Sequence, residues 1–516
     1  MPTMKKITLY WGLLFLISVG SILLNMQHFS FLSTTAESST VATSAFAAKS
    51  THTLPDADPL TLTYGDLPGY TGWARPIQST AAWYTIAPVP PAVATVGEPF
   101  TWTLSCHSPC PLNLSALFDT RAYGPSILPG KVERHPSGNS YTVTVNFLDS
   151  GTYVVEIVLA FSNVPPLTSF PLTFTFDEPL YEGYLLPGAP FSVQVVHKQG
   201  EVNTTRTGQH SCGAPELYES TTTSALSKAR WKVTSRTRDT GAVPNPGLNA
   251  SYEEYRRGPG SIGFTADYVY MACRLTSLNL LVEQSNALPY RNQHVIVFIG
   301  DSHMRKQYNL FLEYFGGSFE SIYVKTNDGL STRFLEITKA LDKLKKMQQE
   351  RGAQKQIHVL FNAGLHEIAI LCSQRRVRSR GRIINVPDEA FSCTQQYEVD
   401  LTKLIKLVRG LPNASVVFQS TSAGWLKWGN YGFGWEPNRT QEYPLDSHAC
   451  ADFNDVAFKV MDQHDIPVMD SFWLTVARPD HRQIDPFNSR GKKLVHSGVE
   501  IYEVLLRKWM SIVLED

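Results

Sequence analysis

The sequence has no excess of charge of either sign, because its 46 Lys and Arg residues are matched by 46 Asp and Glu residues. Proteins that bind nucleic acids gain most of their affinity by neutralising phosphates with basic side chains. The balanced charge therefore argues against a nucleic-acid partner. The sequence also has no P-loop, no dinucleotide-binding glycine pattern and no Cys/His set with the spacing of a zinc site. We accordingly expect no bound cofactor and no metal.

Cysteine is scarce as well, with 7 in 516 residues, which suits an oxidising compartment in which a few disulfide bonds form. Order along the chain suggests the pairs Cys106–Cys110, Cys212–Cys273 and Cys372–Cys393, and leaves Cys450 unpaired or able to bridge two chains. Connectivity does not follow from sequence alone. Five N-glycosylation triplets agree with a secretory environment, at Asn113, Asn203, Asn249, Asn413 and Asn438.

One apolar run is long enough to cross a bilayer. Lys5 and Lys6 precede the apolar residues 7–24, and a helix of roughly 20 residues spans the hydrocarbon core. Positive charge on the N-terminal flank favours a cytoplasmic N-terminus. We therefore expect a cytoplasmic tail and a signal-anchor transmembrane helix in residues 1–32. The protein would be a single-pass type II protein of the Golgi or another secretory-pathway membrane, with its catalytic domain in the lumen. A cleaved signal peptide is the alternative.

Three further segments precede the last part of the chain. Residues 33–50 are rich in Ser, Thr and Ala, and we interpret residues 33–86 as a stem or linker. In residues 87–178, short segments with alternating apolar residues are separated by Pro and Gly, which predicts an Ig-like or filamin-like β-sandwich. Residues 179–293 show no clear period, and we interpret them as a connector that packs on the catalytic domain.

Strand-like and helix-like patterns alternate from residue 294 to residue 516. Apolar runs of strand length recur at residues 295–299, 322–324, 357–361, 416–418 and 466–469. Because helical patterns lie between them, this alternation predicts an α/β fold with a parallel five-stranded sheet flanked by helices. Active sites in such sheets lie beyond the carboxyl ends of the strands.

Ser302 stands where the first of these strands runs into a helix, in the sequence Gly300-Asp301-Ser302-His303. A serine at such a turn holds its hydroxyl above the sheet edge, and the helix N-terminus favours negative charge beside it. An ordinary helix N-cap is the alternative interpretation. His496 precedes the last helix and could activate the serine as a general base, although a lone loop histidine is more often simply exposed.

Two further strand ends carry residues that could stabilise an oxyanion. Asn362 follows the third strand, and its side-chain amide could donate a hydrogen bond. Gly329 follows the second strand and could bring a backbone N–H group close to a substrate. The alternatives are a loop asparagine that satisfies its own backbone and a plain turn.

Three blocks of sequence together resemble the SGNH/GDSL superfamily and, within it, the PC-esterase group. They are Phe298-Ile-Gly-Asp-Ser-His-Met-Arg305, Leu360-Phe-Asn-Ala-Gly-Leu-His366 and the closing stretch from Val468 to His496. That group includes plant trichome-birefringence-like polysaccharide O-acetyltransferases, sialate O-acetyltransferases and the NXPE (neurexophilin and PC-esterase) proteins. The sandwich ahead of the last domain is most similar to the NXPE architecture. The resemblance thus implies an SGNH-type sheet for residues 294–516.

The resemblance also implies roles for individual residues. Ser302 would be the nucleophile and His496 its general base. Asn362 and Gly329 would line the oxyanion hole. Contacts to the substrate would come from Arg305 and His366.

The sequence departs from the family at the acid of the triad. Many members place an Asp three residues before the histidine, where this chain has Lys493. We expect Asp485 to take this role because it lies close to His496 along the chain. Asp470 and Asp480 are the alternatives.

The function implied by the resemblance is Golgi-type glycan O-acyl transfer, most simply O-acetyl transfer, through an acyl-serine intermediate. A donor such as acetyl-CoA would be a co-substrate, and the acceptor would be a glycan or glycoconjugate. An acetylesterase with the same residues and water as the acceptor is one alternative. A non-catalytic luminal or adhesion protein that retains the fold is another.

Overall fold

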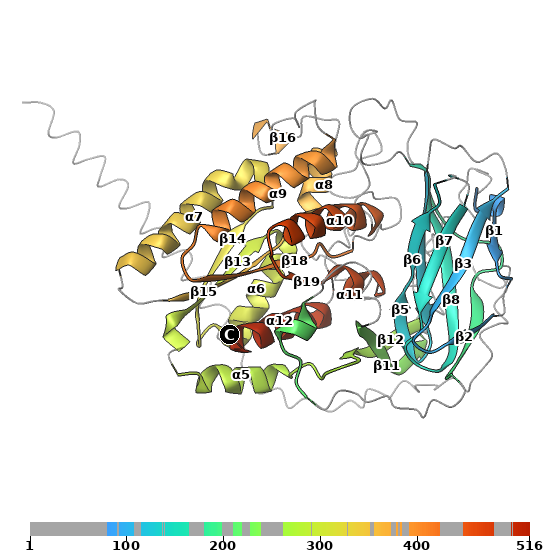
Figure 1. Ribbon diagram of the computed structural model, residues 1–516, viewed down its shortest axis with the longest axis horizontal. Helices are drawn as coiled ribbons and strands as arrows, with labels where there is room; N and C mark the ends of the chain where they lie inside the picture. Colours follow the sequence, from blue (N-terminus) through green and yellow to red (C-terminus); the bar gives the residue numbers. More distant parts are fainter. Residues whose placement is uncertain are drawn as a thin grey trace, which may run out of the picture. The chain divides into compact units, whose positions relative to one another are not determined.

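The computed structural model describes most residues between 80 and 515. Outside the described residues lie 1–79, 108–114, 165–179, 199–209, 219–227, 239–261, 351–354, 373–377, 384–391, 424–446 and 479–496, together with a few shorter stretches. The described part contains a β-rich portion with two large sheets and an α/β portion built on a third sheet (Figure 1).

The first β-rich sheet is antiparallel, with the strand order β1-β3-β7-β6. It contains β1 (Tyr84–Ala87), β3 (Pro99–Cys106), β6 (Lys131–Arg134) and β7 (Ser140–Asn146). Along β7, the buried side chains of Tyr141, Val143 and Val145 alternate with half-buried ones. This alternation reflects the two-residue period of a strand that has one face against a core.

The second β-rich sheet has eight strands, in the order β12-β11-β5-β4-β8-β10-β2 with β9 paired to β8. They are β2 (Ala92–Thr95), β4 (Ser115–Tyr123), β5 (Ser126–Pro129), β8 (Gly151–Val164), β9 (Leu180–Leu185), β10 (Phe191–Val196), β11 (Ala229–Arg238) and β12 (Ile262–Tyr270). The sheet is mixed, because β10 runs parallel to β2 and antiparallel to β8.

The fold class predicted from the sequence is therefore wrong as stated. It confined the β-sandwich to residues 87–178, whereas β9 to β12 continue the second sheet through residues 180–270. These strands pair with partners that are distant in sequence, such as Phe191 with Val155 and Trp231 with Ile127. The choice of a distant pairing partner leaves no periodic signal in the strand itself, because tertiary contacts decide it.

The two β-rich sheets enclose a core of their own. Trp102 of β3, Val143 of β7, Phe118 of β4 and Ile157 of β8 are almost completely buried in it. The rings of Trp102 and Phe191 have their centroids 5.3 Å apart, so β10 packs against the facing sheet. Burial of one such large side chain is worth about 1.5–3 kcal/mol.

The third sheet is parallel throughout and has the order β14-β13-β15-β18-β19. It contains β13 (His294–Gly300), β14 (Glu320–Lys325), β15 (Gln356–Phe361), β18 (Ala414–Gln419) and β19 (Val468–Met469). Strands β13 and β15 are buried on both faces. Burial on both faces explains why they appear in the sequence as continuous apolar runs.

Helices cover both faces of this sheet (Figure 1). One face packs against α7 (Leu330–Glu350), α8 (Leu365–Leu371), α9 (Cys393–Arg409) and α10 (Ser447–Gln463). The other packs against α5 (Leu278–Ala287), α6 (Ser302–Phe315) and α12 (Val499–Glu515). Val297 and Ile299 of β13 belong to the first core cluster, whereas Ile296 and Phe298 belong to the second.

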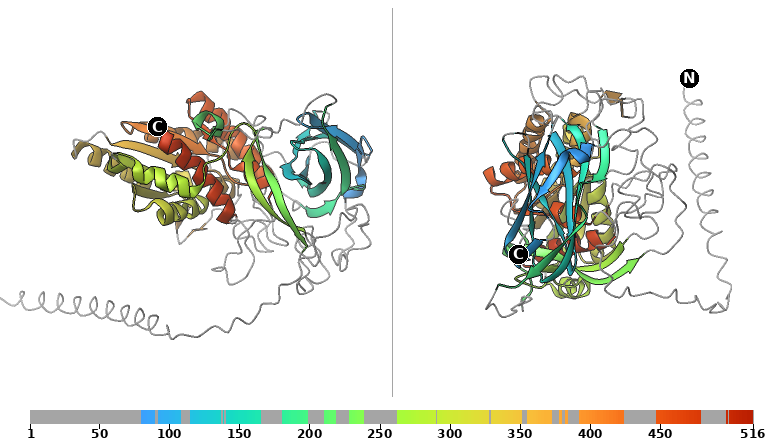
Figure 2. Two further views of the ribbon diagram at one scale, coloured as in Figure 1. Left: turned by 90° about the horizontal axis from the view of Figure 1, so that it is seen from below. Right: turned by 90° about the vertical axis from the view of Figure 1, so that its right-hand side faces the viewer.

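Strands β11 and β12 form a long antiparallel ribbon (Figure 2) that contacts the α/β portion. The ring N–H of Trp231 in β11 donates to the carbonyl of Leu474 in α11 (Phe472–Val476) at 2.9 Å. The Arg478 guanidinium lies 4.7 Å from the centroid of the Trp231 ring. Both side chains are buried, so this contact joins the mixed sheet to the segment that follows β19.

Disulfide bonds join Cys212 to Cys273 and Cys372 to Cys393, which are the same pairs that chain order suggests. Cys106 is also disulfide-bonded, and its expected partner Cys110 lies outside the described residues. Cys450 is buried and is present as a thiol.

None of the helices in the described part of the chain is long and apolar enough to cross a membrane. This finding contradicts the predicted single-pass type II topology, the transmembrane part of the predicted fold and the Golgi-membrane localisation. The apolar run at residues 7–24 on which that prediction rested lies outside the described residues. Helix α12, which is rich in apolar residues, has 17 residues and packs into a protein core.

The contact of Trp231 with α11 can be tested with a matched pair of tryptophans. Trp231 and Trp509 are both buried, but the ring N–H of Trp509 has no hydrogen-bond partner among the residues that the structure places. Removing the donor from a buried carbonyl costs about 1–3 kcal/mol. We expect Trp231→Phe to lower the free energy of unfolding by about 1–3 kcal/mol more than Trp509→Phe does, as measured by urea denaturation. Equal losses would show that the hydrogen bond contributes nothing.

Candidate active site

The carboxyl edge of the parallel sheet has a switch point at β13. From this strand the chain continues to β14 on one side, and β15 lies on the other, and active sites of open parallel sheets lie at such a point. Backbone hydrogen bonds hold the three strand ends together. The Thr326 N–H donates to the Gly300 carbonyl at 2.8 Å, and the Asn362 N–H donates to the Ile299 carbonyl at 2.9 Å.

Ser302 is the first residue of α6, directly at this switch point. The preceding Asp301 caps the helix, because its carboxylate accepts from the His303 N–H at 2.8 Å. Gly300 permits the close turn, since a β-carbon there would lie 2.6 Å from the β-carbon of Met304. Ser302 is 4% exposed, and its hydroxyl has no hydrogen-bond partner among the described residues. A buried hydroxyl without a partner is unusual and indicates a site for a ligand, a water molecule or another segment.

Asn362 lies at the same edge, but its side chain makes a contact within the sheet. Its amide N–H groups donate to the carbonyl oxygens of Gln419 and Ser420, at 2.9 and 3.3 Å. The side chain thereby links the end of β15 to the end of β18. In this arrangement the amide donates to backbone rather than to the space beside Ser302.

Gly329 also follows its strand at this edge, in the left-handed conformation with φ +79°. A side chain at this position would strain the backbone and would bring a β-carbon within 2.9 Å of the Ile370 side chain. Its N–H donates to the Thr326 carbonyl at 2.9 Å. The glycine therefore shapes the turn between β14 and α7, and its N–H group is engaged in that turn.

Glu367 is a central residue of this edge that the sequence interpretation missed. Its two carboxylate oxygens accept from the Leu330 N–H at 2.9 Å and from the Gly364 N–H at 2.6 Å. One side chain thus joins the connection after β14 to the connection after β15. The signal that could have found it is the helix-capping pattern, in which a glutamate at the third helical position bonds back to the cap residue.

The surroundings of Glu367 raise its pKa to about 7. Burial is the main cause, because removal from water disfavours the charged carboxylate. The backbone N–H groups of Gly364 and Leu330 act in the opposite direction, and the nearby negative charge of Asp301 raises the pKa further. Two buried carboxyl groups therefore lie within electrostatic reach of each other beside Ser302.

Helix α12 contributes a tyrosine to the same region. The Tyr502 hydroxyl lies 3.2 Å from Nδ1 of His303, and both side chains are buried. Burial raises the pKa of Tyr502, while a hydrogen bond with the Ser497 backbone lowers it. Spacing along the chain does not predict this contact, because His303 and Tyr502 are 199 residues apart.

Further buried polar atoms have no hydrogen-bond partner within the described part of the chain. Both side-chain atoms of Gln307 on α6 are in this state, as are Oδ1 of Asn327 after β14 and Oε1 of Gln419 at the end of β18. Gln307 and Gln419 are 0% and 1% exposed. Because the protein interior normally satisfies such groups, these atoms mark a polar region around the carboxyl edge of the sheet.

Asp470 follows β19 and holds a structural position. Its carboxylate accepts from the Ser420 hydroxyl at 2.9 Å and from the N–H groups of Phe472 and Trp473, each at 3.0 Å. Burial raises its pKa, and the positive charge of Lys508 opposes that shift. The Asp470 carboxylate thus binds the first two N–H groups of α11, whose N-cap residue is Ser471, and ties them to Ser420.

The structure describes some of the other predicted site residues and not others. Arg305 is exposed on α6, and His366 is half-buried on α8. His496, Asp480 and Asp485 lie outside the described residues.

Of the glycosylation triplets, Asn413 is exposed in the turn before β18, and the other four also lie outside the described part. In the described part, no group of three or more His, Cys, Asp or Glu side chains is placed to hold a metal ion.

Comparison with known proteins does not assign the chain to a family. No family model matches the sequence, and no curated protein matches it. Among solved structures, the filamin domain of Lin-41 is similar over 22% of this chain and 94% of its own length, at 12% sequence identity and a TM-score of 0.17. A likeness of this size carries no argument about fold or function.

The buried titration of Glu367 predicts a pH dependence of stability. Its pKa of about 7 lies above the ordinary value of 4.5, so the folded protein holds a proton that the unfolded chain releases between these values. The stabilisation from that proton is complete below about pH 4.5 and is lost as the pH rises through 7. We expect the free energy of unfolding to fall by about 3 kcal/mol across this window relative to Glu367→Gln.

Urea denaturation between pH 4.5 and 8 measures this difference. Glu313→Gln, at an exposed position of α6, is the matched control. Its free energy of unfolding should change with pH as that of the wild type does. If the free energy of unfolding of Glu367→Gln also fell with pH as that of the wild type does, the assignment of this titration to Glu367 would be contradicted.

Proposed function

We propose that the α/β portion is an SGNH-type acyl-transfer domain, with Ser302 as the nucleophile and a glycan hydroxyl as the acceptor. The observation that carries this proposal is the Ser302 hydroxyl, which is buried and without a described partner at the switch point of the parallel sheet. The residue also opens the 14-residue helix α6. The N-terminus of such a helix stabilises negative charge that develops beside it.

A second observation supports His496 as the general base. The backbone of Ser497, the next residue, is hydrogen-bonded to the Tyr502 hydroxyl, which also lies 3.2 Å from Nδ1 of His303. His303 is in turn the neighbour of Ser302. These contacts place Ser497, which follows His496 in the sequence, at the same end of the sheet as the serine.

The proposed reaction has two steps. In the first, His496 accepts the Ser302 proton as the hydroxyl oxygen attacks an acyl donor of the acetyl-thioester class, and the thiol leaves with that proton. In the second, His496 deprotonates a glycan hydroxyl, which attacks the acyl-serine and regenerates the free serine. With water in place of the glycan, the same site would be an acetylesterase.

We assign the oxyanion first of all to the backbone N–H of Ser302 at the α6 N-terminus. The N–H of Gly329 and the amide of Asn362 donate within the protein, so each would have to exchange a partner in order to contribute. One donor to an oxyanion is typically worth about 10²–10³ in rate.

Substitution of the nucleophile tests the proposal. Ser302→Ala should abolish acyl transfer from acetyl-CoA to a glycan panel, with products detected by mass, and should abolish acetate release. The free energy of unfolding should stay within about 1 kcal/mol of wild type, because no described hydrogen bond is lost. Ser318→Ala, beyond the opposite end of α6, where the hydroxyl donates to Asn286 at 2.9 Å, should keep full activity. Full activity in folded Ser302→Ala would refute the mechanism.

The acid of the triad is tested by three single substitutions. We propose Asp485 and keep Asp480 as the alternative, because the carboxylate of Asp470 already accepts three hydrogen bonds at the start of α11. Asp485→Asn should therefore reduce kcat severely with little loss of stability. Asp470→Asn should mainly lower stability, by about 1–3 kcal/mol. If all three variants had only mild kinetic effects, none of these aspartates would be the acid, and the catalytic group would be a Ser-His dyad.

A further inference from the structure

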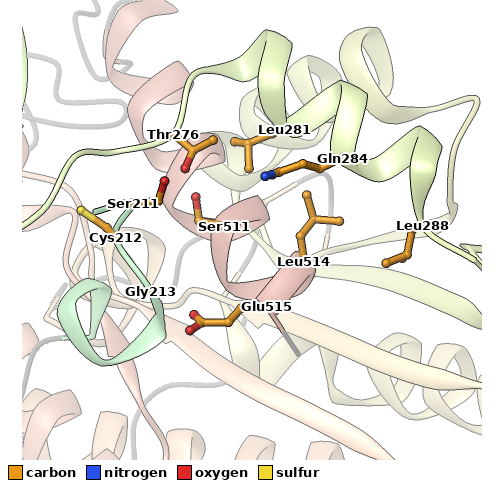
Figure 3. Close-up of a pocket in the computed structure, with 10 residues that line it drawn as sticks. All are labelled: Ser211, Cys212, Gly213, Thr276, Leu281, Gln284, Leu288, Ser511, Leu514 and Glu515. Atoms are coloured by element: carbon orange, nitrogen blue, oxygen red, sulfur yellow. The ribbon is translucent and has the colours of Figure 1, made fainter. Parts of the chain in front are cut away.

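A pocket of about 370 Å³ lies between α5, the end of α12 and the segment around Cys212 (Figure 3). Its size is within the range of about 300–1,000 Å³ that small-molecule sites occupy. It is separate from the edge that carries Ser302. Along α12, Tyr502 and Ser511 are nine residues apart, which corresponds to about 14 Å of helix.

Hydroxyl groups gather at one end of this pocket. Figure 3 shows the side chains of Ser211, Thr276 and Ser511 with their oxygens close to one another, and the Gln284 amide extends toward them from α5. Ser511 is 8% exposed, and its hydroxyl has no hydrogen-bond partner in the described part of the chain. An unpartnered hydroxyl that lines a pocket is available to a ligand that can both donate and accept.

The backbone that carries these hydroxyls is held by bonds of its own. The disulfide between Cys212 and Cys273 lies beside Ser211, and the Cys212 N–H donates to the Arg274 carbonyl at 3.0 Å. The Arg507 guanidinium donates to the carbonyl of Thr276 at 2.8 Å. A wall that is fixed before the ligand arrives loses less freedom on binding.

The charges around the pocket indicate what kind of ligand fits. None of its ten described lining residues is a Lys, Arg or His, and the one ionisable group is the Glu515 carboxylate, which points toward Gly213 (Figure 3). An anion would find no basic partner there. The remaining walls include the apolar side chains of Leu281 and Leu514. The Glu515 carboxylate accepts from the Ala214 N–H. The hydroxyl and amide groups opposite an apolar surface suit a neutral polyhydroxylated ring, which has hydroxyl edges and C–H faces.

We propose that this pocket binds one neutral sugar unit. Hydroxyls of the sugar would exchange hydrogen bonds with Ser511, Thr276 and Ser211, and the Gln284 amide at the rim would donate to a ring or hydroxyl oxygen. The C–H face would lie against Leu281 and Leu514. The proposal does not depend on Ser302 chemistry, because it concerns a different part of α12.

Ligand-observed NMR on the full chain tests this directly. Saturation transfer to the methyl glycosides of glucose, galactose and mannose at millimolar concentration should be detected for at least one of them, and glucuronic acid should bind more weakly. Ser511→Ala and Gln284→Leu should each raise the dissociation constant about threefold to tenfold, as expected for one lost hydrogen bond.

A control variant separates this site from its surroundings. Gln463→Leu is the same change at an exposed position of α10 and should bind as wild type does. Because Gln284 is exposed, its variant is expected to fold even if Ser511→Ala does not. Absence of saturation transfer from all three glycosides, tighter binding of glucuronic acid, or wild-type binding in folded Gln284→Leu and Ser511→Ala would each overturn the proposal.

Discussion

The buried carboxylate of Glu367 is the interaction on which the candidate site depends. It accepts hydrogen bonds from the connection after β14 and from the connection after β15, the two segments beside the Ser302 turn. An ionised carboxylate can accept on both oxygens, whereas a protonated one presents a donor on one of them. The charged form is therefore the one that accepts hydrogen bonds from both connections, and burial raises the free energy of this form. The geometry of the edge and the protonation of one side chain are thus linked.

Helix α12 connects the other parts of the α/β portion. Tyr502 near its start contacts His303, and the Lys508 ammonium donates to the Asp470 carbonyl at 3.0 Å. Ser511 and Glu515 at its end line the sugar-sized pocket. One helix thereby contributes to the switch point, to the end of β19 and to the pocket, so displacement of α12 would disturb all three.

Sequence reasoning succeeded where a pattern is local. Continuous apolar runs identified the five strands of the parallel sheet, and the turn at Ser302 follows from a strand meeting a helix. It was wrong where distant segments decide the outcome, as for the strands beyond residue 178 that pair into the mixed sheet and for the membrane topology. The engagement of Asn362 with Gln419 was equally out of reach, because the partner lies 57 residues away. Glu367 could have been found from its capping pattern, but its second bond, to Leu330, could not.

The polar groups at the carboxyl edge of the parallel sheet are of two kinds, those with hydrogen-bond partners in the described part and those without. The amide N–H groups of Asn362, the N–H of Gly329 and the carboxylate of Asp470 are engaged within the protein, so they fix the geometry of the strand ends. Ser302, Gln307 and Gln419 are buried and lack partners among the described residues. Each unsatisfied group of this kind costs about 1–3 kcal/mol. A ligand, a water molecule or another segment of the chain can supply the hydrogen bonds that these groups lack among the described residues.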